Sequence, residues 1–271
     1  MRRNILPTLI AYGLYIFRLP VHSGIWVFML LILPYSLEAA PPSPFTAVYE
    51  ARYGGFKANA ERSLQIGENG QVEMNTMLRL KMLGKTLSTI KEKSILTADA
   101  LSGELKPEAY SFVQSGIGKR SRHIAFDWDA GQARADIGND LYEIPLEFPV
   151  ADNLSAYLEV RNQLLAGEVE IIFPAIDKGK LEEYHFRVLA EEEVSTSLGL
   201  FRTVKIERVR EPESKRSTIM WLALDWDYLL VKLEQLEQNA RGIELELKQA
   251  AVMGNSVTGK SQKEPESISE L

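Results

Sequence analysis

The stretch that decides the fold is residues 72–82, Val-Glu-Met-Asn-Thr-Met-Leu-Arg-Leu-Lys-Met, in which the even-numbered positions are largely apolar and the odd-numbered ones largely polar. This period of two is typical of a β-strand that packs one face on a core and turns the other to solvent. The same alternation recurs at residues 124–128, 184–188 and 243–247. The sequence therefore predicts an all-β, mainly antiparallel domain of about ten to twelve strands.

One segment breaks this alternation and predicts a helix over about residues 152–166. Its apolar stripe recurs at helical spacing and consists of Leu154, Tyr157, Leu158, Arg161, Leu164 and Leu165. Asp152 or Asn153 can cap the start of this helix, and Gly167 ends it. Arg161 is the one charge on the stripe. It is interpreted either as a snorkelling side chain with its guanidinium at the rim, or as part of a structural ion pair or an anion contact.

The first 39 residues differ from the rest of the chain. Before Glu38 the only formal charges are three arginines, and residues 25–33 form an unbroken apolar run. This pattern predicts a secretory signal peptide that is cleaved after Ala39, because the apolar run is short for a membrane span. An uncleaved membrane anchor is the alternative, since residues 5–17 are also mostly apolar. Either interpretation places the domain in the periplasm, because the arginines stay on the cytoplasmic side.

The remainder of the chain predicts one exported β domain over residues 40–252, followed by a disordered tail over residues 253–271 that lacks any apolar period. No repeat of 20 to 50 residues is visible, which disfavours propellers and solenoids. The chain contains no cysteine, so disulfides, thiolate metal sites and thiol nucleophiles are excluded. A formal charge of −6 argues against binding to nucleic acid.

Residues that could carry out chemistry are scarce. His123 and His185 are the only histidines beyond the N-terminal segment, and they lack the spacing of a metal site. The tripeptide Asp-Trp-Asp occurs at residues 127–129 and 225–227, where two carboxylates on one strand could act as paired acids or cation ligands. Both copies end a predicted strand, so caps of turns are the preferred interpretation. We therefore expect no catalytic residue, metal or cofactor, and keep an enzyme with a diffuse carboxylate site as an alternative.

The late strands are apolar on both faces. In residues 219–224 and 228–231 neither face is polar, so each face needs a cover. One face packs on the core, and the other either packs on the predicted helix or lines an apolar cavity, which barrels of eight or more strands can enclose. The candidate ligand-binding residues are Trp221, Met220, Leu222, Tyr228 and Tyr157.

Two segments carry a resemblance to a known family. Residues 152–161, Asp-Asn-Leu-Ser-Ala-Tyr-Leu-Glu-Val-Arg, are similar to the Asp-x-Leu-Ser helix ending in Arg of the bacterial family called domain of unknown function 3108. Residues 219–232 resemble the family's Trp-strand, turn and Tyr-Leu-Pro-Val strand, although Leu230 stands where the family usually carries Pro. The motif residues to which the resemblance assigns a structural role are Asp152, Ser155, Arg161 and Asp225.

The resemblance implies an open or spiral β-barrel with a helix against it, similar in shape to envelope carriers that hold lipid or lipoprotein acyl chains. We therefore expect a non-enzymatic protein of the periplasm or cell envelope that binds a lipid-like or other apolar ligand within the barrel. The alternative is a structural or protein-interaction module of the envelope with a filled core and no ligand. A cavity of several hundred Å³ lined by Met220, Trp221 and Leu222 would favour the carrier.

Overall fold

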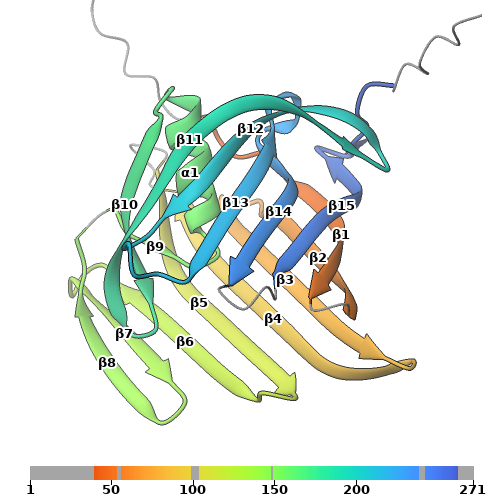
Figure 1. Cartoon of the computed structure of the whole chain (residues 1–271). Coiled ribbons are helices and arrows are strands. Elements are labelled where there is room, and N and C mark those ends of the chain that lie inside the picture. The colour runs from red at the N-terminus through yellow and green to blue at the C-terminus, as the bar shows by residue number, and fades with distance from the viewer. Residues whose placement is uncertain (1–39, 54–55, 99–103, 148, 238–241, 262–271) are drawn as a thin grey trace, which may run out of the picture. The chain divides into compact units, whose positions relative to one another are not determined.

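The computed structural model describes residues 40–261 except 54–55, 99–103, 148 and 238–241 (Figure 1). The predicted signal segment, residues 1–39, and the last ten residues of the predicted tail lie outside the described residues. In the part of the chain that is described, no helix has both the length and the apolar character needed to cross a bilayer.

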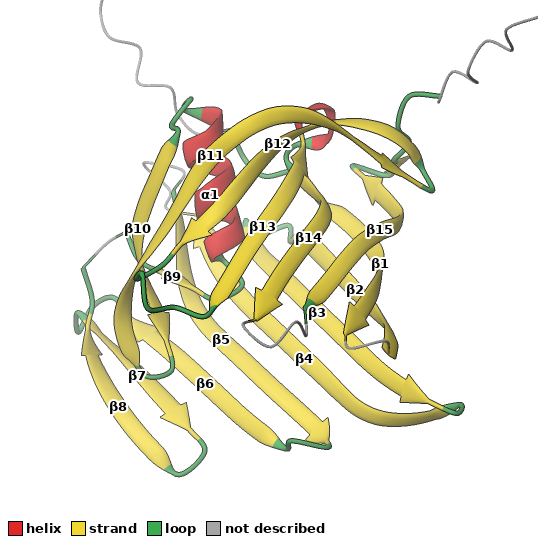
Figure 2. Cartoon of the chain, in the orientation of Figure 1, coloured by secondary structure: helices red, strands yellow, loops and turns green. Residues whose placement is uncertain are grey.

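The described residues form one sheet of sixteen strands, one α-helix and one 3₁₀-helix (Figure 2). The elements in chain order are β1 (Phe45–Tyr53), β2 (Phe56–Ile66), β3 (Gln71–Met82), β4 (Lys85–Ala98), β5 (Leu105–Gly116), β6 (Arg120–Asp127), β7 (Gln132–Ile137), β8 (Asp140–Pro145), β9 (Ala151–Asp152), α1 (Ala156–Leu165), β10 (Glu170–Asp177), β11 (Lys180–Thr196), β12 (Gly199–Val209), β13 (Arg216–Ala223), η1 (Leu224–Trp226), β14 (Leu229–Glu237), β15 (Ile243–Val252) and β16 (Asn255–Ser256).

The sheet consists of two antiparallel meanders joined at a single long-range pair. Strands β1 to β8 follow one another in sequence order, strands β15 to β10 do the same on the other side, and β1 pairs with β15. Only the short β9, at the far edge, runs parallel to its neighbour β10. The ladder ends at β8 and β9, which are not hydrogen-bonded to each other, so the barrel is open.

The prediction of an open, mainly antiparallel barrel with one helix is therefore confirmed. The sheet has more strands than the ten to twelve expected, partly because β9 and β16 contain two residues each. Strands of that length are too short for an alternation of apolar and polar residues to be visible.

Side chains bridge the open seam where backbone pairing stops. The hydroxyl of Ser94 on β4 donates a hydrogen bond of 2.6 Å to the carboxylate of Asp152 on β9. Arg122 on β6 lies 3.5 Å from the carboxylate of Asp177 on β10. Gly179 sits against the ring of Tyr142 on β8, where a Cβ atom would collide with the ring. The two meanders are thus linked across the opening by side-chain contacts and by the packing of Gly179 against Tyr142, and not by backbone hydrogen bonds of the described residues.

Helix α1 packs inside the curl and begins later than expected. The carboxylate of Asp152 accepts hydrogen bonds from the backbone N–H groups of Leu154 and Ser155, and the hydroxyl of Ser155 accepts one from the N–H of Asp152. This reciprocal turn occupies the residues expected to form the first helical turn, so the helix starts at Ala156. Gly167 follows the helix with φ of +84°, as expected for a residue that ends it.

The prediction of a disordered tail from residue 253 is wrong for residues 254–261. The side chain of Val257 is only 3% exposed, and its N–H donates to the carbonyl of Ala250. Further along, Lys260 exchanges two backbone hydrogen bonds with Leu200 at the start of β12. These residues are held by backbone hydrogen bonds and by one buried valine. Neither feature produces a periodic pattern of apolar residues, so the sequence gives no sign of this order.

Candidate functional site

A cavity of about 680 Å³ lies inside the curled sheet, enclosed by strands from both meanders and by α1. Its lining comes from β2, β4, β5 and β6 on one side and from β10 to β14 on the other. The two groups of strands are brought face to face because the sheet curls around α1 (Figure 1). The cavity is therefore a product of the whole sheet rather than of any local motif.

One end of the cavity is apolar. Leu222 on β13 pairs with Leu230 on β14, and both side chains are buried against the cavity. Helix α1 contributes Ala156, Tyr157 and Val160 to the same lining. The hydroxyl of Tyr157 donates a hydrogen bond of 3.0 Å to the carbonyl of Tyr228, which fixes α1 beside the start of β14. An apolar group at this end would replace water against leucine, valine and aromatic carbon.

Much of the remaining lining is cationic, and one of these cations, Arg62, stacks on Tyr157 beside the apolar end. The positively charged side chains are Arg62, Arg120, Arg122, Lys178, Arg208, Arg210 and Arg216. Only two carboxylates, those of Glu92 and Asp177, line the cavity with them. The sequence does not reveal this group of cations, because its members come from four separate strands and two loops. The one feature of the sequence that indicates an inward position is the alternation of faces along a strand. Arg62 lies two residues from the buried Ala60 and Leu64 and therefore shares their face of β2.

Aromatic rings hold several of these guanidinium groups in place. Arg208 lies 3.7 Å from the ring centroid of Tyr184, and Arg62 lies 4.4 Å from that of Tyr157. Such stacking orients a guanidinium without neutralising it. Burial, followed by repulsion from Arg208 and Arg216, lowers the pKa of Arg210 to about 10.

The carboxyl group of Glu92 is buried, and its environment disfavours the charged form. Burial raises the pKa of its carboxyl group, and the hydroxyl of Tyr110 donates a hydrogen bond of 3.2 Å to it. Asp177 is shared between Arg122 and the side-chain amide of Asn153. The cationic part of the cavity is thus only partly balanced by its own carboxylates.

The structure separates the predicted lining residues. Met220, Leu222 and Tyr157 line the cavity, whereas Trp221 lies on the other face of β13, with its ring 5.1 Å from Lys205 Nζ and 4.8 Å from Lys232 Nζ. Three consecutive strand residues cannot all face one cavity, because neighbours point to opposite faces. The expectation of a cavity wall made by Met220, Trp221 and Leu222 together is therefore wrong for Trp221.

Tyr228 also lies outside the cavity lining. It follows Asp227 in the tight turn before β14, and both residues have positive φ angles, of 58° and 52°. The Tyr228 hydroxyl donates to the carbonyl of Leu164 at a distance of 3.4 Å, which ties the turn to the end of α1. Tyr228 therefore supports the helix that forms the apolar end, instead of contacting the cavity itself.

Arg161 forms the structural ion pair that was one of its two interpretations. Its guanidinium is 2.7 Å from the carboxylate of Asp227, and the side chain is 3% exposed. The same guanidinium donates to the carbonyl groups of Ala40 and Pro41. The partner is Asp227 and not the motif residue Asp225, which lies at the surface 3.5 Å from Arg202.

The other candidate chemical groups are dispersed. Within the described residues no group of three or more histidine, aspartate or glutamate side chains is placed to hold a metal ion. The carboxylate of Asp127 accepts a hydrogen bond from the N–H of Ala130, as a turn cap does. His185 contacts Glu170 on the outer face of the sheet, opposite Tyr184 and Phe186.

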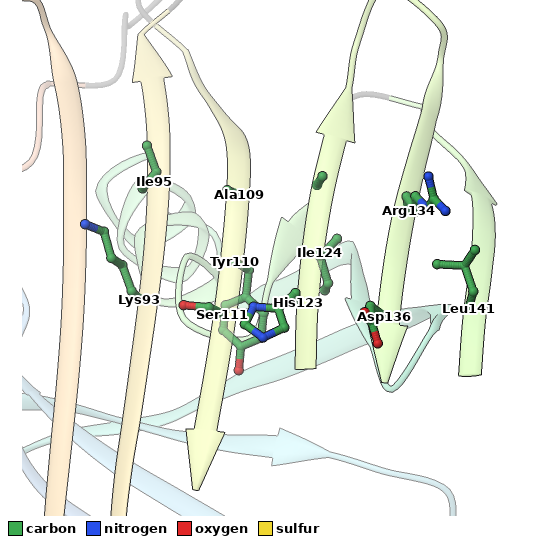
Figure 3. Close-up of a pocket in the computed structure, with 11 residues that line it drawn as sticks. Lys93, Ile95, Ala109, Tyr110, Ser111, His123, Ile124, Arg134, Asp136 and Leu141 are labelled. Atoms are coloured by element: carbon green, nitrogen blue, oxygen red, sulfur yellow. The ribbon is translucent and has the colours of Figure 1, made fainter. Parts of the chain in front are cut away.

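A second concavity, of about 460 Å³, lies on the outer face of strands β4 to β8 (Figure 3). It exists because Ala109, Ser111 and Ala125 are small and leave a depression between larger neighbours. One cross-strand row through it runs from Lys93 to Ser111, His123, Asp136 and Leu141. Its lining comes from one meander alone, whereas the interior cavity is lined by strands of both meanders and by α1.

The fold and cavity define an open β-barrel with an internal helix. The chain belongs to the family of proteins of unknown function DUF3108, whose model matches residues 48–248. No curated protein matches the chain. Among solved structures, the beta-barrel-like protein of domain of unknown function DUF1849 from Brucella abortus is similar to it, with a TM-score of 0.54 and 10% identity over 79% of this chain and 99% of that one. At that identity the likeness concerns the fold alone.

Proposed function

We propose that this protein is a non-enzymatic component of the bacterial periplasm or cell envelope that binds a lipid-like ligand in its interior cavity. The observation that carries the proposal is the cavity of about 680 Å³, whose apolar end is formed by buried residues of α1, β13 and β14. Cavities of about 300 to 1,000 Å³ with an apolar lining and a few placed polar groups are typical of small-molecule sites. This volume supports a carrier over the alternative of an interaction module with a filled core.

The proposed location is supported by sequence alone. Residues 1–39 have the charge distribution and apolar run of an export signal, and the chain has no cysteine that an oxidising compartment would modify. Fractionation of bacterial cells that express the full chain tests this location. Recovery in the cytoplasmic fraction, without shortening at the N-terminus and without membrane attachment, would contradict it.

The ligand is tested by native mass spectrometry of the protein purified from the periplasm, combined with organic extraction of the same sample. We expect a discrete additional mass that is recovered in the organic phase. If the protein instead carries no added mass and takes up no offered lipid, the interaction module with a filled core becomes the better description.

A matched pair of variants locates the binding. Met220→Trp places a large side chain in the cavity, whereas Val113→Trp adds the same group to the exposed outer face of β5. We expect Met220→Trp to weaken binding of the uncharged fluorescent probe N-phenyl-1-naphthylamine by about tenfold or more, and Val113→Trp to leave it unchanged. Thermal unfolding of both variants establishes that they are folded. Equal effects of the two substitutions would place the probe outside the cavity.

A further inference from the structure

We infer that the cavity selects an amphipathic anion: a lipid-like molecule with a carboxylate or phosphate group at the cationic part of the cavity and its chain against α1. This inference rests on the proposed function and adds the charge and the orientation of the ligand.

The inner faces of β12, β13 and β14 change in one direction from apolar to charged. At the end beside α1, Leu222 pairs with Val204 and with Leu230. One step further along β13, Met220 pairs with Ile206 and Leu233.

The next two inward positions of β13 are polar. Thr218 pairs with Gln235 and accepts a hydrogen bond of 3.1 Å from Arg210, and Arg216 follows. Arg208 sits at the same end, paired with Phe186 on β11. The cavity wall is thus divided along the strands into an apolar half and a guanidinium half, which is the pattern that an amphipathic molecule would match.

The facing wall supplies guanidinium groups from a second set of strands. Arg62, Glu92, Phe112 and Arg122 lie in one cross-strand row through Thr76. Arg120 and Arg122 lie 5.2 and 5.1 Å from the ring centroid of Phe112, so both guanidinium groups are placed by the same ring. Positively charged side chains of both meanders therefore line the same cavity.

Most of these cations have no carboxylate of their own. Arg122 pairs with Asp177 and Arg216 with Glu237, but Arg62, Arg120, Arg208 and Arg210 form no ion pair with any carboxylate of the described residues. The Nε atom of Arg62 is buried and has no hydrogen-bond partner within the described part of the chain. Arg62, however, stacks on Tyr157 of α1 and so lies beside the apolar end. At the other end, Arg120, Arg208 and Arg210 are the guanidinium groups without a carboxylate that a bound anion would neutralise.

The chemistry of the site fits an acidic headgroup. The chain has a formal charge of −6, so a cavity with seven cations and two carboxylates is contrary to its average composition. Planar guanidinium groups donate paired hydrogen bonds to carboxylate and phosphate oxygens. Arg120, Lys178 and Arg216 are exposed, whereas Leu222 and Leu230 are buried, so the cationic end is the one that faces solvent. An amphipathic anion can therefore insert its chain first and keep its charge near the opening.

The test compares a fluorescent fatty acid, 11-(dansylamino)undecanoic acid, with its methyl ester, which has the same chain and fluorophore but carries a neutral methyl ester in place of the carboxylate. The protein is purified in the form that a bacterial host makes from the full chain. We expect the wild-type protein to bind the acid about tenfold or more tightly than the ester. The double variant Arg208→Gln/Arg210→Gln should lose this preference and retain its affinity for the ester.

Arg134→Gln is the control for the chemistry of the substitution, because it also replaces an arginine by glutamine, but on the outer face of β7. It should leave the preference for the acid intact. Should the double variant fail to fold, salt provides the second measurement: binding of the acid to the wild-type protein should weaken with ionic strength, and binding of the ester should not.

The outcomes separate the inference from the proposed function. Equal affinity for acid and ester, or an equal loss in the double variant and in Arg134→Gln, would overturn the inference and leave a neutral apolar carrier. Binding of neither probe would overturn the proposed function as well. Inorganic phosphate serves as a competitor that has no chain: if it displaces the acid at comparable concentrations, the site takes a free anion and the amphipathic ligand is rejected.

Discussion

Single residues decide how the N-terminal end of the domain is attached. The buried guanidinium of Arg161 joins α1 to Asp227 in the turn before β14 and to the backbone of Ala40 and Pro41. The second carboxylate oxygen of Asp227 accepts a hydrogen bond of 2.8 Å from the N–H of Ser43. One ion pair therefore holds the helix, the turn and the first residues of the domain together.

Replacing Arg161 by alanine leaves the carboxylate of Asp227 without its charged partner. Loss of one partner of a buried pair costs about 3 to 5 kcal/mol, so Arg161→Ala should lower the free energy of unfolding by that order. Urea denaturation measures the change. Arg202→Ala, which removes the exposed partner of Asp225, is the control and should have little effect. A melting temperature unchanged by Arg161→Ala would show that the pair adds nothing.

A second prediction concerns the buried carboxyl of Asp152. Burial raises its pKa above the ordinary value of 3.8, despite hydrogen bonds from Ser94, Leu154 and Ser155. At a pH between that ordinary value and the raised pKa, the carboxyl group loses its proton in the unfolded chain and retains it in the folded chain. The contribution of this group to stability is therefore complete at low pH and is lost as the pH rises toward the raised pKa.

Asp152→Asn is neutral at every pH and keeps an oxygen that can accept the two backbone hydrogen bonds. We expect the free energy of unfolding of Asp152→Asn, minus that of the wild type, to increase as the pH rises from about 4 to 7. The reason is that only the wild type loses stability through ionisation of this group. Asp152→Ala, which cannot accept those bonds, should be destabilised by about 1 to 3 kcal/mol throughout. A difference between Asp152→Asn and wild type that does not vary with pH would contradict a raised pKa.

The sequence predicted some of these residue roles and missed others. Arg161 could be singled out because a charge on an apolar helical stripe needs a partner, yet nothing local indicated whether that partner was Asp225 or Asp227. The choice depends on the tight turn at residues 227 and 228, where both residues take positive φ angles that are uncommon outside glycine. Trp221 shows the converse: its apolar character does not indicate which face of β13 it occupies, whereas its position between Met220 and Leu222 along the strand does.

At the scale of elements, strand positions were predictable where alternation is regular. The alternation over residues 72–82 falls within β3 at 71–82, and that over residues 243–247 falls within β15 at 243–252. Irregular pairing was harder to predict. Between β13 and β14 the register shifts at Trp221/Leu222, which leaves Val231 without a partner and forms a bulge. The bulge is present even though residue 230 is leucine and not the proline that is usual in the family. A bulge that persists without proline has no sequence signal of its own.

The ordered segment after β15 yields an element-scale prediction. Residues 254–261 pair with β15 and with the start of β12, and they bury Val257. A chain that ends after Met253 should therefore melt about 5 °C lower, because it loses the burial of one valine and several backbone hydrogen bonds. Differential scanning calorimetry measures this. A chain that ends after Ser261 is the control and should match the wild type; equal melting temperatures for both truncations would show that this pairing contributes no stability.

For the molecule as a whole, the fold class was predictable and the charge of the cavity was not. Alternation and the resemblance of two segments were sufficient for an open antiparallel barrel with one helix. The cationic half of the cavity required the fold, because Arg62, Arg122 and Arg208 are far apart in sequence and meet only when the sheet curls. Charges at core-facing strand positions were the available signal, and average composition, with its net negative charge, pointed away from them.

The pairing of β1 with β15 has a consequence for the order in which the chain is made. Strands β2 to β8 can each pair with the strand before them as they emerge, but one edge of β1 stays without its partner until about 200 more residues have been synthesised. An unpaired strand edge is open to other chains, including other copies of this one. The first strand of the sheet to be made is thus among the last to be fully protected, and its open edge can pair with another chain until β15 has been made.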